Sequence, residues 1–162
     1  MKPIFKNLGR FSLLVFCFFP LSALAALLDY GARVWQTDDG LPQNHVQSIL
    51  QTRDRYIWVG TQKGLARFDG VRFTIFTPEN TPALKGRSIT TLCESGDGTL
   101  WIGTSDGGLT RLYEGKFSHF GRSEGLGSDY VRILYETKDR VLWIGTREGL
   151  YQLKRGFLSS VQ

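Results

Sequence analysis

The sequence predicts an all-β fold, a β-propeller with three four-stranded antiparallel blades, and this prediction depends on a repeat. A tryptophan begins the same four-residue motif three times, in Trp58–Thr61, Trp101–Thr104 and Trp143–Thr146. Successive motifs lie 43 and 42 residues apart, and an aspartate stands four residues before each tryptophan. A period in the low forties that is carried by short apolar segments is typical of a propeller blade.

Each period reads as four short strands separated by turn residues. In the first copy, the runs 46–51, 56–61, 65–68 and 71–76 are rich in β-branched and aromatic residues, with Asp or Gly between them. Such runs are typical of an antiparallel meander. The predicted blades cover about residues 46–77, 89–121 and 131–161.

Residues 32–37 align with the fourth strand of a blade and are predicted to form an orphan outer strand. In closed propellers such a strand completes the last blade and seals the ring, and a ring needs at least about four blades. We therefore expect residues 26–162 to be a partial propeller from a ring of about seven blades. The sequence would then be the start of a longer protein, or a remnant with open strand edges.

Tryptophan and glycine recur at fixed positions of the repeat and are expected to have packing roles. An indole is large enough to fill the gap between neighbouring blades, and the glycine two residues later allows close approach of another backbone. A ligand site seldom needs the same residue in every blade. The structural repeat residues are Trp58, Gly60, Trp101, Gly103, Trp143 and Gly145.

The first 25 residues have the order of a secretory signal peptide. Three basic residues precede an apolar run, and Ala23-Leu24-Ala25 supplies the small residues that signal peptidase requires. We expect cleavage after Ala25 and a periplasmic mature chain. The alternative is an uncleaved anchor, which is disfavoured because the apolar run is short for a membrane span.

Charge and cysteine content argue against two kinds of chemistry. The chain has 20 basic and 15 acidic residues, but three of the basic ones lie in the predicted signal peptide, which leaves a mature net charge of about +2. No Lys/Arg cluster remains, so nucleic-acid binding is not expected. Cys93 is the only cysteine of the predicted mature chain, so we expect it to pack as a small hydrophobic residue without an internal disulfide.

A longer set of residues carries a family resemblance. It comprises Trp35-Gln36-Thr37-Asp38-Asp39-Gly40-Leu41-Pro42-Gln43-Asn44, the run 46–52, Trp58-Val59-Gly60-Thr61, Gly64-Leu65 and Arg67-Phe68-Asp69-Gly70. Together these residues resemble the two-component regulator propeller repeat, and the resemblance extends over nearly the whole chain after the signal peptide. Two segments depart from the pattern: Pro82-Ala83-Leu84 replaces Asp-Gly-Leu, and Lys154-Arg155-Gly156 replaces Phe-Asp-Gly.

The resemblance implies an extracytoplasmic propeller that binds a small molecule, often a carbohydrate. It would signal through a membrane helix to a histidine kinase or diguanylate cyclase output domain. No output motif occurs in this sequence, so the resemblance implies a non-catalytic input region without a cofactor, and membrane contact would need segments beyond this sequence. Its partners would be the ligand and either the remaining blades or another copy of the chain. The alternative is a secreted propeller that is itself a glycan-binding protein or a polysaccharide lyase.

The residues favour binding over catalysis. His45 and His119 have no partner at metal-ligand or catalytic spacing, so neither a catalytic residue nor a metal ligand is assigned. In propellers, the loops from the fourth to the first strand and from the second to the third meet at one edge. Here they vary between copies, and specificity can arise at such positions. The ligand-binding candidates are Asn44, His45, Lys63, Arg87, Asp106, Asp129 and Arg147.

Overall fold

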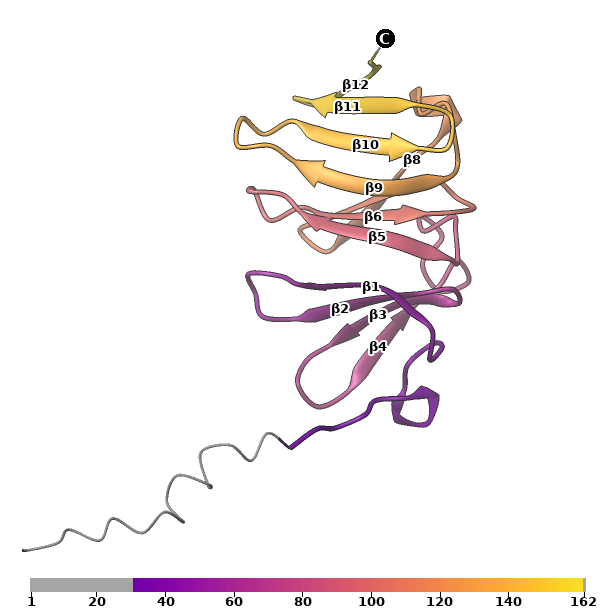
Figure 1. Ribbon diagram of the computed structural model, residues 1–162, viewed down its shortest axis with the longest axis vertical. Coiled ribbons are helices and arrows are strands. Elements are labelled where there is room, and N and C mark those ends of the chain that lie inside the picture. The colour runs from indigo at the N-terminus through magenta and orange to yellow at the C-terminus, as the bar shows by residue number, and fades with distance from the viewer. Residues whose placement is uncertain (1–30, 162) are drawn as a thin grey trace, which may run out of the picture. The chain divides into compact units, whose positions relative to one another are not determined.

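The computed structural model describes residues 31–161, and Val34 onward forms one compact unit. The described residues contain three four-stranded antiparallel sheets (Figure 1). In the same range, no helix is long and apolar enough to cross a membrane. The predicted signal peptide, residues 1–25, lies outside the described residues.

The strands of each sheet are neighbours in chain order, as in a propeller blade. Blade 1 comprises β1 (Val46–Gln51), β2 (Ile57–Thr61), β3 (Gly64–Phe68) and β4 (Phe73–Phe76). Blade 2 comprises β5 (Ile89–Glu94), β6 (Leu100–Thr104), β7 (Leu109–Tyr113) and β8 (Lys116–Phe120). Blade 3 comprises β9 (Val131–Glu136), β10 (Leu142–Thr146), β11 (Leu150–Lys154) and β12 (Phe157–Ser160). The prediction of an all-β fold with three four-stranded antiparallel blades is confirmed.

The first hairpin of each blade turns in the same way. Its tight turn contains a residue with a left-handed backbone: Arg55 (φ 71°), Gly98 (φ 86°) or Arg140 (φ 64°). Each hairpin places the tryptophan of the second strand opposite the first strand, so that Trp58 pairs with Leu50 and Trp101 with Cys93. The shared register brings equivalent side chains of successive blades to equivalent positions.

The cores lie between blades. Trp58 is 3% exposed and packs in a cluster that includes Leu100 of blade 2. Trp101 is 6% exposed and packs in a cluster that includes Leu142 of blade 3. The indole N–H groups donate to hydroxyls of their own blade, at 3.2 Å for Trp58 and 3.0 Å for Trp101, so these buried donors are satisfied.

Two glycines of the repeated motif allow this close packing of blades. A Cβ at Gly60 would lie 2.7 Å from Cγ2 of Ile89, and one at Gly103 would lie 2.6 Å from Cγ2 of Thr91 and 2.7 Å from Cγ1 of Val131. Ile89 and Val131 belong to the next blade. A larger residue at either position would therefore need side chains of the next blade to shift.

We therefore expect Gly103→Ala to lower the free energy of unfolding by about 1–3 kcal/mol, the usual cost of overpacking. Ser118→Ala, an exposed change on β8, is the control and should alter it by less than about 0.5 kcal/mol. Urea denaturation of the three proteins measures both effects. Equal midpoints would contradict the close contact between Gly103 and blade 3.

The structure differs from the prediction of an outer strand at residues 32–37. Residues 31–36 have irregular backbone, and Thr37–Asp39 form a short 3-10 helix, η2. A strand forms only by pairing with another strand, and no sheet of the described residues includes this segment. Trp35 instead packs its ring on Phe68 and Phe73 of blade 1, with centroids 4.7 and 5.7 Å apart.

The turn that follows this segment does match the end of a blade. A second 3-10 helix, η3 (Arg122–Glu124), lies between blades 2 and 3 and precedes blade 3 as η2 precedes blade 1. The Asp39 carboxylate accepts from the N–H of Gln36 at 2.9 Å, and the Glu124 carboxylate accepts from the N–H of Gly121 at 2.7 Å. The alignment of this segment with the end of a blade thus holds for the turn but not for the strand.

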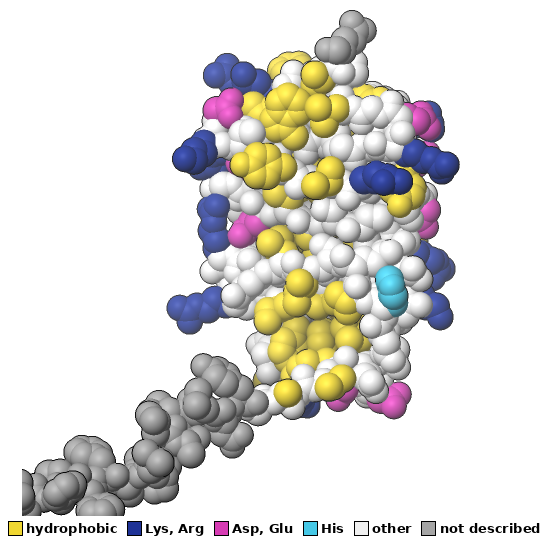
Figure 2. Space-filling model, viewed as in Figure 1, with side chains coloured by type: hydrophobic (Ala, Val, Ile, Leu, Met, Phe, Trp, Pro, Cys, Tyr) yellow, Lys and Arg dark blue, Asp and Glu magenta, His cyan; other side chains and the backbone are white. Residues whose placement is uncertain are grey.

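The outer faces of blades 1 and 3 are apolar, and hydrophobic side chains gather over both blades in Figure 2. On blade 1, Ile49 is 68% exposed. On blade 3, Ile133 and Tyr135 are 63% and 64% exposed. Blade 2 is covered on both sides, because β5 contacts β1 and β9.

Candidate functional site

The seven candidate residues lie on the loops of one edge of the blades, where β2, β6 and β10 end and β1, β5 and β9 begin. Because neighbouring strands are antiparallel, these two sets of loops meet. Six of the candidates are exposed and Asp129 is half-buried. We call this the loop edge and define it by Asn44, His45, Lys63, Arg87, Asp106, Asp129 and Arg147.

The structure brings Arg87 and Asp106 together. The carboxylate of Asp106 accepts from the backbone N–H groups of Arg87 and Ser88, each at 3.3 Å. The guanidinium of Arg87 pairs with Glu79. Asp106 therefore fixes the connection into blade 2 against the β6–β7 loop.

Arg122, which is outside the predicted set, joins the connection into blade 3 to the β10–β11 loop. Arg122 forms ion pairs with Asp129 and with Glu148, both at 3.4 Å. The backbone N–H of Arg147 donates to the carbonyl of Tyr130 at 3.1 Å. In the sequence, the signal for Arg122 was its place before Gly125 in the connection between blades 2 and 3. This connection is one of the loops that vary between copies of the repeat.

The remaining candidates stay apart from this network. Asn44 Oδ1 accepts from the N–H of Thr37 at 2.8 Å and holds the chain that leads into blade 1. No hydrogen bond or ion pair of the described residues joins the side chains of His45 and Lys63 to another candidate. Their exposed side chains are available to a ligand.

The described residues show little sign of reactive groups. In residues 31–161, no three His, Cys, Asp or Glu side chains come close enough to hold a metal ion. Burial raises the pKa of the Cys93 thiol, and a neutral thiol is a poor nucleophile. Burial also lowers the pKa of His119, whose Nδ1 is buried without a hydrogen-bond partner.

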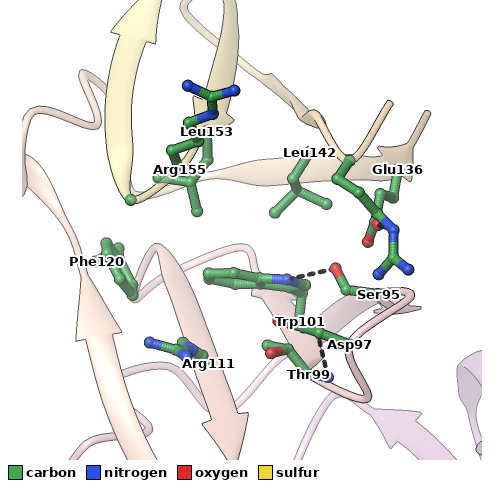
Figure 3. Close-up of a pocket in the computed structure, with 12 residues that line it drawn as sticks. Ser95, Asp97, Thr99, Trp101, Arg111, Phe120, Glu136, Leu142, Leu153 and Arg155 are labelled. Carbon is green, nitrogen blue, oxygen red and sulfur yellow. Dashed lines mark hydrogen bonds and ion pairs between the residues drawn. The ribbon is translucent and has the colours of Figure 1, made fainter. Parts of the chain in front are cut away.

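Two grooves that the sequence analysis did not predict open between blades at the opposite edge. Their volumes are about 410 and 400 Å³. The first groove, between blades 1 and 2, contains Thr52, Asp54, Trp58, Arg67, Thr74, Phe76, Glu94, Gly98, Leu100, Leu112, Glu114, Gly115 and Phe117. The second groove, between blades 2 and 3, contains Ser95, Asp97, Thr99, Trp101, Arg111, Phe120, Glu136, Arg140, Leu142, Leu153, Arg155 and Gly156 (Figure 3).

Sequence comparison matches all three blades to one family. The model described as "two component regulator propeller" matches residues 40–63, 83–106 and 125–148. Each segment covers the connection into a blade, its first two strands and the following loop. Histidine kinase P4 from Formosa agariphila is 35% identical over 81 residues, which are 49% of this chain and 6% of that protein.

Solved structures share the fold. The extracellular domain of a protein assigned to hybrid two-component systems of B. thetaiotaomicron has a TM-score of 0.73 at 21% identity, over 81% of this chain and 19% of that one. A catalytically inactive virginiamycin B lyase from Staphylococcus aureus, with quinupristin, has a TM-score of 0.58 at 13% identity, over 76% of this chain and 43% of that one. These likenesses show the propeller fold alone, and the chain spans less than half of each relative. The three segments matched in register with the three blades identify the chain as a protein of two-component regulator propeller repeats.

Proposed function

We propose that the chain is a ligand-sensing propeller region of an extracytoplasmic receptor in bacterial signal transduction. The observation that carries this proposal is the match of all three blades to the two-component regulator propeller. The identity to a histidine kinase over 81 residues supports it, as does the signal-peptide pattern of the first 25 residues. Recognition would be the task of this region, and output would belong to other domains.

The loop edge is the proposed place of recognition. Its framework is held by hydrogen bonds and ion pairs that join the connection into a blade to the loop after the second strand of that blade, through Asp106 in blade 2 and Arg122 before blade 3. Exposed basic side chains, Lys63 and Arg147, stand on this framework. Polar side chains on rigid loops suit a carbohydrate or another polar small molecule, because its hydroxyl groups need directed hydrogen bonds.

A thermal-shift screen of the exported chain against oligosaccharides and polar metabolites tests this proposal. A ligand at ten times its dissociation constant should raise Tm by about 2–6 °C. Lys63→Ala should reduce that shift, whereas Lys116→Ala, an exposed lysine at the opposite edge, should preserve it. Loss of the shift in both variants would contradict recognition at the loop edge, and a panel without any stabilising compound would count against sensing.

A further inference from the structure

The two grooves between blades are built alike but carry different charges. Each has a tryptophan of the repeated motif, an arginine paired with it across the sheet, and a phenylalanine of the fourth strand. Each also has two leucines of the next blade. At about 400 Å³, the second groove is large enough for a small organic molecule.

One part of the second groove is apolar. Trp101 lies between the two blades, with Leu142 and Leu153 of blade 3 on one side (Figure 3). Phe120 stands beside it, with ring centroids 5.6 Å apart. This part would accept an apolar body and would exclude water from it.

The two carboxylates of the second groove already have partners. Glu136 accepts from the N–H of Gly96 at 3.1 Å and pairs with Arg140 at 3.9 Å. Asp97 accepts from the N–H of Thr99 at 2.9 Å. Partial burial of Asp97 opposes ionisation, but the hydrogen bonds from Thr99 and the charge of Arg111 together outweigh it and hold the pKa of Asp97 below its usual range.

The arginine of the second groove is less well partnered than its counterpart in the first. Arg67 lies over the rings of Tyr56, at 4.4 Å, and of Trp58, at 5.7 Å. Thr99 stands at the position of Tyr56, so Arg111 lacks that ring and lies over Tyr113, at 4.8 Å. The Nε of Arg111 is buried without a hydrogen-bond partner in the described part of the chain.

Two positions at the mouth change the charge between the grooves. The first groove has Gly98 and Glu114 where the second has Arg140 and Arg155. Both pairs stand in hairpin turns with positive φ, so the backbone geometry is shared. The first groove thus holds three carboxylates and one guanidinium, whereas the second holds two carboxylates and three guanidinium groups. An anion is attracted to the second groove alone.

We propose that the second groove binds a small carboxylate with an apolar body. The carboxylate would be held at the mouth by the exposed Arg155 and attracted by Arg111, because guanidinium groups match carboxylate geometry. The apolar body would lie against Trp101 and the leucines of blade 3. This site lies at the edge opposite the loop edge and does not depend on the proposed sensing function.

Calorimetric titration of the exported chain with phenylacetate tests the proposal. A dissociation constant on the order of 1 mM is expected for a ligand of this size. Phenylacetamide lacks the charge and acetate lacks the apolar body, so each should bind at least about tenfold more weakly. Equal binding of phenylacetamide, or no heat from phenylacetate at concentrations about tenfold above the expected constant, would overturn the proposal.

Variants at the mouth locate the site. Arg155→Glu gives the second groove the acidic residue of the first and should weaken phenylacetate binding about fivefold or more, whereas Arg155→Lys keeps the charge without the bidentate geometry and should weaken binding less than Arg155→Glu does. Lys85→Glu makes the same change of charge in the connection into blade 2, at the other edge of the blades, and should change binding less than about twofold. Arg155 and Lys85 are both exposed turn or loop residues, so folding should be preserved. Equal losses in Arg155→Glu and Lys85→Glu would overturn the assignment to this groove.

Discussion

Trp101→Ala is expected to lower the free energy of unfolding by about 3–5 kcal/mol, the cost of truncating a buried aromatic residue. The indole is 6% exposed and packs between blades 2 and 3, with the ring of Phe120 at 5.6 Å. Its loss would also leave the buried hydroxyl of Ser95 without the hydrogen bond that the indole N–H donates at 3.0 Å. Urea denaturation followed by circular dichroism measures the effect.

Two control variants test whether the loss of stability depends on the burial of the Trp101 side chain. Trp143→Ala removes the same residue of the same motif, but Trp143 is only half-buried on the outer face of blade 3, so the loss should be clearly smaller. Arg147→Ala, at the loop edge, should cost less than about 0.5 kcal/mol. A larger loss for Trp143→Ala than for Trp101→Ala would contradict the role of blade contacts in stability.

The repeat was sufficient to predict the blades because their strands pair locally. Each strand pairs with its neighbour in the chain, so alternating apolar residues and turn residues specify the sheet almost completely. The segment 32–37 shows the limit of this reasoning. Its residues align with a fourth strand, but a strand also needs a partner from elsewhere, and a single-sequence pattern does not show whether that partner is in place.

The candidate site was predictable in position but not in contacts. Topology alone placed Lys63 and Asp106 at the same edge of neighbouring blades. The sequence did not show that Asp106 would bind backbone N–H groups, or that Arg122 would join two acidic loops. Such choices depend on the angle between blades and on side-chain rotamers, which the repeat pattern does not specify.

The grooves were missed because each combines residues from two blades. The repeat position of Trp101 predicts a packing role only, and its neighbours Leu142 and Arg155 lie about 40 residues or more away in the chain. A usable signal was present: an arginine follows Trp58 and Trp101 on the next strand, facing the same groove. Comparing such equivalent positions for changes of charge would have pointed to the mouth residues.

The exposed faces of blades 1 and 3 provide a second comparison of equivalent positions. Leu65 and Leu109 are fully buried between blades, whereas the equivalent Leu150 on blade 3 is 42% exposed. On the other side, Leu134 of blade 3 is 8% exposed, whereas its equivalent Ile49 on blade 1 is 68% exposed. Each face thus shows to solvent the side chains that other blades bury against a neighbour. Blades of such repeats are stabilised by this burial.

We therefore expect residues 26–162 to self-associate, with a mass in light scattering that exceeds one chain and grows with concentration, because contact between chains would cover these faces. Ile49→Lys and Tyr135→Lys each place a charge on one face and should lower the mass towards that of a monomer. Val71→Lys is the control: Val71 is 82% exposed in the β3–β4 hairpin, away from both faces, and its substitution should leave the mass unchanged. A monodisperse monomer at all concentrations would contradict this prediction, and an equal effect of Val71→Lys would show that association does not depend on the blade faces.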